Sequence, residues 1–228
     1  MSTPTITSTW GSPPTTSTPP RPGSPCSRWW RRSWRRRRRW RLRSTRLAIL
    51  LVLPRTLAAG TALADALDAK AKAFARILKT GRTHLQDAVP ITLGQEFEGY
   101  GANVRHAARE IERSAESLHE LNLGATALGT GLNAGDDVTR ASIANIATAT
   151  GLAVQPARNR FRVTQSMGDV LAFSGALRRL AVEVDKIASD LRLLSSGPRA
   201  GLAEIQLPPV QPGSSIMPGK VNPCVPEM

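Results

Sequence analysis

One stretch near the carboxyl end constrains the fold more than any other part of the chain. Between residues 170 and 194 an apolar residue recurs in alternating steps of three and four: Val170, Phe173, Leu177, Leu180, Val184, Ile187, Leu191 and Leu194. This is the heptad spacing of one face of an α-helix, and about 25 residues at 1.5 Å each predict a helix of roughly 38 Å. So long an apolar face needs equally long partners, so the sequence predicts a bundle of long helices.

Two earlier segments have the same kind of spacing. The first runs from about residue 47 and is expected to stop at Gly81, and the second runs from about Gly94 to Asn122. A shorter helix is expected to start at Asp136 or Asp137, either of which can cap it, and to end at Gly151. No strand pattern competes after residue 46, and the polar stretch that carries Pro90 is expected to be a loop. The predicted fold class is therefore all-α, with apolar faces left incomplete for other subunits to cover.

The positive charge of the chain belongs to its front segment. The net charge is +14, and residues 1–55 hold thirteen arginines and no acidic residue. The remaining 173 residues hold 18 Lys+Arg (31 less 13) against 17 Asp+Glu. The charge therefore says little about what the body of the chain binds.

Residues 1–46 are expected to be disordered and to form a separate segment from residues 47–228. Residues 2–27 are rich in Ser, Thr and Pro, and residues 28–46 interleave arginine with tryptophan. Arginine and tryptophan together can grip phosphates and stack on bases, so a tether to nucleic acid or to a membrane is one interpretation. The other interpretation is an unstructured tail or the product of a shifted reading frame. We favour the second and expect no nucleic-acid partner.

The cysteines and the apolar runs place the chain in the cytoplasm. Cys26 and Cys224 are far apart in the sequence, which is neither a disulfide framework nor a metal-site spacing. The longest uninterrupted apolar run, Leu47–Leu53, is far shorter than the roughly 20 residues of a membrane span. We therefore expect no metal, no membrane and a reducing compartment.

Two loops carry the residues best suited to chemistry. In residues 213–223, Ser214 and Ser215 follow a glycine and can offer backbone N–H groups and hydroxyls to an anion, with Lys220 and Asn222 as further donors. Such a set suits a carboxylate that becomes a dianion, and a serine within it can act as a base. The alternative is an ordinary Gly/Pro-rich surface loop. In residues 81–88, the imidazole of His84 is suited to proton transfer or anion binding, or His84 is simply a solvent-exposed histidine.

Both loops resemble conserved regions of one enzyme family. GSSIMPGKVNP at residues 213–223 resembles the signature loop of the aspartase/fumarase superfamily, and GRTHLQDAVPITLGQEF at residues 81–97 resembles its second conserved region. LGATALGTGLN and LRLLSSGPRAGL, which lie between them, also match, so the resemblance covers roughly residues 56–228. It implies the central helical domain of a homotetramer whose active sites are each built from three subunits.

The resemblance also implies an activity and a set of roles. The reaction is an anti elimination that yields fumarate from a small dicarboxylate or amino-acid substrate through an aci-carboxylate intermediate, with no cofactor. Ser214 matches the catalytic base, and Ser215 contributes donors to the substrate carboxylate. Lys220 and Asn222 match the residues that stabilise the carboxylates.

Three further residues are implicated by the same resemblance. Thr83 and His84 match a substrate-binding pair that a different subunit supplies, and His84 is counted among the catalytic residues. Glu227 falls where fumarases carry a glutamate that pairs with this histidine, so the expected catalytic set is Ser214, His84 and Glu227.

The residues after the signature loop favour one branch of the family. NPCVPEM is closer to the NPVVPE of the aspartase members than to the NPTQCEA of fumarases, so elimination of ammonia from L-aspartate is expected, with fumarate hydration as the alternative. Residues 1–55 resemble none of the substrate-binding regions of the family, and the chain ends soon after the loop. Low or no activity is therefore expected from this chain alone. The alternative outside the enzymes is a binding protein, in which a non-catalytic helical bundle carries a basic tethering tail.

Overall fold

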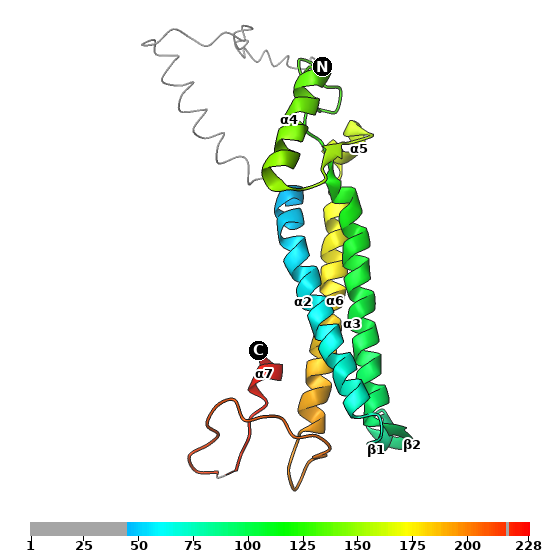
Figure 1. Cartoon of the computed structure of the whole chain (residues 1–228), viewed down its shortest axis with the longest axis vertical. Helices are drawn as coiled ribbons and strands as arrows, with labels where there is room; N and C mark the ends of the chain where they lie inside the picture. The colour runs from blue at the N-terminus through cyan, green and yellow to red at the C-terminus, as the bar shows by residue number, and fades with distance from the viewer. Residues whose placement is uncertain (1–44, 218) are drawn as a thin grey trace, which may run out of the picture. The chain divides into compact units, whose positions relative to one another are not determined.

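Three long helices form the body of the protein. The computed structural model describes residues 45–217 and 219–228. In Figure 1 helices α2 (Thr45–Ala73), α3 (Leu93–Glu116) and α6 (Gly168–Leu194) lie side by side. The predicted bundle of long helices is confirmed. The expected disorder of residues 1–46 lies outside the described residues, apart from Thr45 and Arg46, which begin α2.

The core shows how the three helices run. One cluster joins the start of α2, the end of α3 and the start of α6, through Leu50, Ile111 and Phe173. A second cluster joins the end of α2, the start of α3 and the end of α6, through Leu67, Phe97 and Ile187. Helix α3 therefore runs antiparallel to both α2 and α6. The chain between α2 and α3 forms a small hairpin at one end of the bundle, and the chain between α3 and α6 forms several short elements at the other.

Several short elements connect the long helices. A 3-10 turn, η1, and a two-residue strand follow α3, and a helix that starts after Gly135 ends at Gly151, whose φ of 71° is the left-handed cap expected there. Asp136 and Asp137 lie in the first turn of that helix, and Gly135, not either aspartate, is the N-cap. The short elements are η1 (Ser117–His119), β3 (Glu120–Leu121), α4 (Asp136–Thr150), β4 (Gln155–Pro156), α5 (Arg160–Gln165) and α7 (Cys224–Glu227).

The prediction that the polar stretch carrying Pro90 forms a loop was wrong. Strands β1 (Leu78–Thr83) and β2 (Gln86–Thr92) pair antiparallel as a hairpin at one end of the bundle (Figure 1). Gly81, expected to stop the first helix, lies buried in β1, and a Cβ there would stand 2.7 Å from the Val89 carbonyl oxygen. Close approach of the two strands therefore requires a glycine. The hairpin carried no strand signal because most of its side chains are exposed and do not alternate.

The heptad face of α6 is only partly covered. Phe173, Ile187 and Leu194 are buried, whereas Leu177 and Val184 are 42% and 38% exposed. The predicted helix, Val170–Leu194, is two residues shorter than the observed one at its start. The incomplete coverage is what the sequence led us to expect of a helix in a larger assembly.

Helix α2 has the length and composition of a membrane span. Among the described residues it is the one helix that meets this test, with a mean hydropathy of 1.8 over an 18-residue window that is 22% buried. The longest uninterrupted apolar run of this helix, Leu47–Leu53, is short, but further alanines and leucines keep the mean hydropathy of the window high. Leu47, Leu50 and Leu67 of α2 pack in the core against α3 and α6. Core packing therefore explains part of this apolarity.

Candidate active site

The β1–β2 hairpin presents Thr83 and His84 at its tip. Thr83 pairs with Gln86 across a two-residue turn made by His84 and Leu85, whose φ angles are 52° and 62°. Two left-handed residues in a row define the type I′ turn, which normally takes Asn-Gly because other side chains are strained there. His84 and Leu85 are thus held in a costly conformation, a feature that concentrates at functional sites. Both Thr83 and His84 are exposed.

A hollow of about 490 Å³ lies beside this turn. Its walls come from the hairpin, the first turn of α3, the last turns of α6 and the segment after α6. A second hollow, of about 530 Å³, lies between α2 and the start of α3, but no predicted site residue lines it. The hollow beside the turn is lined by Lys79, Gly81, Arg82, Thr83, His84, Leu85, Ala88, Val89, Ile91, Glu96, Lys186, Asp190, Leu193, Leu194 and Leu202.

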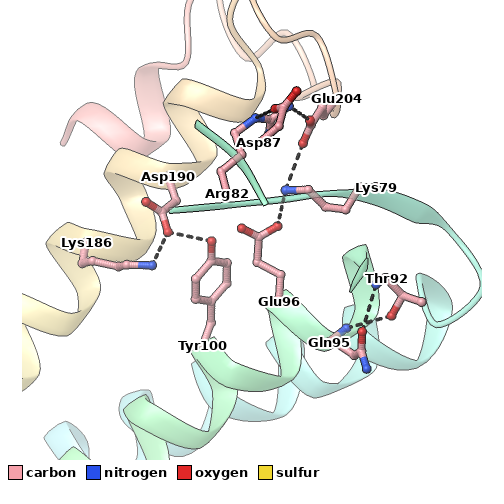
Figure 2. Close-up of polar contacts among 10 residues, drawn as sticks. All are labelled: Lys79, Arg82, Asp87, Thr92, Gln95, Glu96, Tyr100, Lys186, Asp190 and Glu204. Carbon is pink, nitrogen blue, oxygen red and sulfur yellow. Dashed lines mark hydrogen bonds and ion pairs between the residues drawn. The ribbon is translucent and has the colours of Figure 1, made fainter. Parts of the chain in front are cut away.

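A network of ion pairs joins three residues that line the hollow, Lys79, Arg82 and Glu96, to Glu204 and Asp87 (Figure 2). Lys79 of β1, whose side chain is 8% exposed, lies 2.6 Å from a carboxylate oxygen of Glu96 and 2.9 Å from one of Glu204. Arg82 of β1 donates to the other oxygen of Glu204 at 2.5 Å and lies 3.6 Å from Asp87. One carboxylate beyond α6 therefore binds both cations of the strand that leads into the Thr83–His84 turn.

The network fixes the charge states of its members. Burial acts to raise the pKa of Glu204, but hydrogen bonds from Arg82 and Lys79 outweigh it and hold that pKa below its ordinary value. Burial acts to lower the pKa of Lys79, but hydrogen bonds to Glu96 and Glu204 raise it above its ordinary value. Glu204 and Lys79 are therefore both charged at neutral pH, and the network of ion pairs has a net charge close to zero.

A second polar group, from α3 and α6, contributes Lys186 and Asp190 to the lining of the same hollow. The Tyr100 hydroxyl donates to Asp190 at 2.7 Å, and Lys186 hydrogen-bonds the same carboxylate oxygen (Figure 2). The Lys186 ammonium also lies 4.8 Å from the centre of the Tyr100 ring, within cation–π range. Burial and the hydrogen bond to Asp190 raise the pKa of Tyr100 far above its ordinary value, so the phenol stays protonated and a donor.

The signature loop folds on itself a short distance past α6. Ser214 and Met217 form an antiparallel bridge, and the Ser214 hydroxyl oxygen accepts from the Ile216 backbone N–H at 3.3 Å. A Cβ on Gly213 would stand 2.1 Å from the Lys220 carbonyl oxygen, so a glycine is required where the two ends of the loop meet. Ser214 is half-buried, whereas Ser215 and Lys220 are exposed. The two serines and the lysine thus lie in one tight loop.

Asn222 lies near the end of the signature loop, and Glu227 is the last residue of α7. The half-buried Asn222 accepts from the Cys224 backbone N–H at 2.9 Å through its backbone carbonyl oxygen. Glu227 lies 3.2 Å from Arg192 of α6, and both side chains are about half exposed. Within one chain, then, the partner of Glu227 is Arg192, and no hydrogen bond or ion pair of the described residues joins Glu227 to His84.

The predicted site residues therefore lie in two separate places, which we call the two half-sites. Thr83 and His84 line the hollow beside the hairpin, and no residue of the described part of the signature loop lines it. The sequence patterns did not predict the polar residues that line the hollow, Lys79, Arg82, Glu96, Lys186 and Asp190, or their partners Tyr100 and Glu204. Glu96, Arg82 and Glu204 lie in or directly after motifs quoted above, and that position was the available signal. The described residues include no cluster of three His, Cys, Asp or Glu side chains that could hold a metal ion.

Comparison with known proteins gives a consistent picture. A family model described as "Lyase" matches residues 43–228. The chain is 50% identical over 183 residues to an aspartate ammonia-lyase of Helicobacter pylori, which covers 80% of this chain and 39% of the relative. It is 51% identical over 162 residues to a class II fumarate hydratase of Neisseria meningitidis, covering 71% of this chain and 35% of the relative.

A solved structure shares the fold as well. A fumarate lyase:delta crystallin from Brucella melitensis, bound to cobalt, superposes with a TM-score of 0.76 at 50% sequence identity, over 80% of this chain and 40% of that one. The chain thus spans about two-fifths of the length of the curated relatives it matches.

Proposed function

Because the chain belongs to the lyase family that contains the aspartases and class II fumarases, we propose that it is the central part of an aspartate ammonia-lyase. The substrate is L-aspartate, and the products are fumarate and ammonia. The observation that carries this choice is the segment 213–227, where the signature loop continues into Pro-Cys-Val-Pro-Glu in the aspartase manner. The 183-residue match to an aspartate ammonia-lyase supports it.

The loop geometry suits Ser214 as the base. Its alkoxide removes a proton from Cβ of the substrate, and the electron pair of the broken C–H bond moves into the adjacent carboxylate to give an aci-carboxylate dianion. The Ile216 backbone N–H, 3.3 Å from the Ser214 hydroxyl oxygen, is placed to stabilise the alkoxide. Ser215 and Lys220, exposed on the same loop, supply donors and a positive charge to the dianion.

The second step restores the carboxylate. The electron pair returns to form the double bond between Cα and Cβ, the Cα–N bond breaks, and nitrogen leaves as ammonia. Thr83 and His84 bind the substrate from the hairpin turn, and Asn222 adds a neutral donor. Glu227 is proposed to pair with His84 between subunits, in place of its contact with Arg192 within one chain. No cofactor is needed, because every charge that develops is met by a side chain or a backbone N–H.

The two half-sites imply that a complete site combines copies of the chain. The hollow beside Thr83 and His84 lacks the base, and the loop that carries the base lacks the hairpin. A homotetramer in the cytoplasm, with each site shared among subunits, would bring the hairpin of one copy to the signature loop of another. The exposed apolar residues of α6 support such an assembly.

Two chimeras test the activity. Residues 47–228 replace the matching segment of the Helicobacter pylori aspartate ammonia-lyase in one and of the Neisseria meningitidis fumarate hydratase in the other. We expect the first to form fumarate from L-aspartate, and the second to form little from L-malate, because the segment is built for the aspartase branch. The opposite pattern would establish the fumarase alternative.

Serine variants of the active chimera test the mechanism. Ser214→Ala should lower kcat by at least about a hundredfold, since general-base catalysis contributes that much or more. Ser189→Ala, which removes an exposed hydroxyl of α6, is the matched control and should leave kcat unchanged. Normal turnover by Ser214→Ala would disprove the role of this serine as the base.

A further inference from the structure

The segment between α6 and the signature loop has no part in the chemistry above, yet it is tightly built. The Glu204 backbone N–H donates to the Leu194 carbonyl oxygen at 2.9 Å, and the Ala203 N–H donates to that of Ser196 at 2.8 Å. A Cβ on Gly201 would stand 2.4 Å from the Ser196 carbonyl oxygen, so the turn requires a glycine. The motif SSGPRAGL thus returns the chain to the end of α6 and fixes the place of Glu204.

From that place Glu204 binds both cations of strand β1. Its two carboxylate oxygens lie 2.5 Å from Arg82 and 2.9 Å from Lys79, and the three side chains are at most 20% exposed (Figure 2). Arg82 is the residue directly before Thr83. Partly buried charges of this kind hold their partners firmly, because separation leaves a charge without compensation.

The turn that follows needs such support. His84 and Leu85 both adopt left-handed backbone conformations, and strained residues persist only where their surroundings determine the geometry. The turn itself is exposed and packs against little. The support must therefore come through the strands, and on β1 the strongest polar contacts are those with Glu204 and Glu96.

We propose that Glu204 is a positioning residue for the substrate-binding turn. By holding Arg82 and Lys79 it transmits the fixed position of the end of α6 to Thr83 and His84. The inference rests on the proposed function, because it assigns the turn to substrate binding. Its predicted effect on the hairpin is nevertheless measurable without catalysis.

Hydrogen exchange in the full 228-residue chain is the first test. Glu204→Gln keeps the shape and removes the charge, and amide exchange within residues 78–92 should become about tenfold faster, the change expected on losing one hydrogen bond to a charged group. Glu120→Gln is the matched control, since Glu120 is 15% exposed and also lies near two arginines, Arg158 and Arg162. It should leave residues 78–92 unchanged.

The histidines report the same effect by NMR. The chain has three histidines. His119 is next to the control residue Glu120, and His84 is two residues after Arg82, the partner of Glu204. Glu204→Gln should shift the imidazole signals of His84 and leave those of His119 in place, whereas Glu120→Gln should do the reverse. A merely structural role for Glu204 would disturb both histidines or neither.

A second variant covers the case in which Glu204→Gln does not fold. Arg82→Gln removes the other end of the ion pair and should accelerate exchange in residues 78–92 to a similar extent, and the double variant should add little to either change. Unchanged exchange and unchanged His84 signals in Arg82→Gln would overturn the inference, as would faster exchange spread evenly over α2 and α3.

Kinetics in the active chimera link the turn to substrate. Glu204→Gln should raise KM for L-aspartate about tenfold with a smaller change in kcat, whereas loss of the base acts on kcat. A chimera without activity would sink the proposed function and leave the exchange result standing. An active chimera whose Glu204→Gln variant keeps wild-type KM and wild-type exchange would refute the positioning role alone.

Discussion

Leu85 has a backbone conformation that is poorly suited to its side chain. Its φ of 62° lies in the left-handed region, which costs an L-residue about 1–2 kcal/mol. The Leu85 side chain is 68% exposed, so little packing offsets this cost. At the second central position of a type I′ turn, glycine is the residue without the penalty.

Leu85→Gly is therefore expected to stabilise the chain. The relief of strain exceeds the added flexibility of glycine in the unfolded state, and the free energy of unfolding should rise by about 1 kcal/mol. Urea denaturation followed by circular dichroism measures it. Leu128→Gly is the control, because Leu128 is 71% exposed and is not left-handed. It should lower stability, and an equal effect of both variants would mean that the turn is not strained.

At the scale of the elements, one arginine at the start of α2 contacts both the end of α3 and the start of α6. Arg46, in the first turn of α2, donates to the Ser117 carbonyl oxygen just after α3 and to Asp169 in the first turn of α6. Asp169 also accepts from Arg162 of α5 at 2.9 Å. Burial acts to raise the pKa of Asp169, but hydrogen bonds from Arg46 and Arg162 hold it below its ordinary value of 3.8.

The sign of this shift sets a pH dependence. A carboxyl group with a depressed pKa contributes stability that is complete above its unfolded pKa and is lost as the pH falls through its folded pKa. Asp169→Asn should therefore be about 2 kcal/mol less stable than the wild type at pH 7. The gap should close as the pH falls below about 4. Thermal unfolding of both proteins across this range measures the gap.

Asp137→Asn serves as the comparison. Asp137 pairs with Arg140 but is 95% exposed, so solvent screens the pair and the variant should cost well under 1 kcal/mol. A gap between wild type and Asp169→Asn that stays constant down to low pH would show that the charge of Asp169 contributes no stability.

Elements that bury an apolar face were predictable from sequence, and the hairpin was not. The spacing from Val170 to Leu194 gave α6 to within two residues, because that helix is defined by the core it covers. In β2 five consecutive side chains are exposed, so the strand has no alternation of apolar and polar residues from which it could be predicted. Pairing there depends on Gly81, which lets the Val89 carbonyl approach, and on ion pairs with Glu204, far away in the chain.

The candidate site also has a part that was predictable from sequence and a part that was not. Ser214, Ser215 and Lys220 share one loop, so a local motif was sufficient to predict their proximity. The pairing of Lys79 with Glu204 joins segments separated by two long helices, and no local pattern contains it. That the hairpin and the signature loop remain separate within one chain follows from their positions on the bundle, which only the packing of α2, α3 and α6 determines.

At the scale of the whole molecule, α6 has apolar side chains on two faces. Besides the heptad face, Leu171, Val182 and Leu193 recur at intervals of eleven residues, close to three helical turns, and are 72%, 59% and 40% exposed. A helix that is apolar on more than one face is normally buried on more than one side. Since α2 and α3 cover only the heptad side, other copies of the chain are the natural cover for the second face.

We therefore expect the purified chain to sediment well above its 24.5 kDa monomer mass, and a second-face variant to dissociate. Leu171→Glu combined with Val182→Glu places two charges on that face, and burying them between subunits would be strongly unfavourable. Val138→Glu on α4 is the control, because Val138 is 66% exposed and the change is chemically the same. Analytical ultracentrifugation distinguishes the species.

If the wild-type chain is monomeric, or if Val138→Glu dissociates it equally, the second face of α6 is not the contact. In that case the sharing of hairpin and signature loop between copies must be achieved through another surface, which would move the search to the exposed residues at the start of α2.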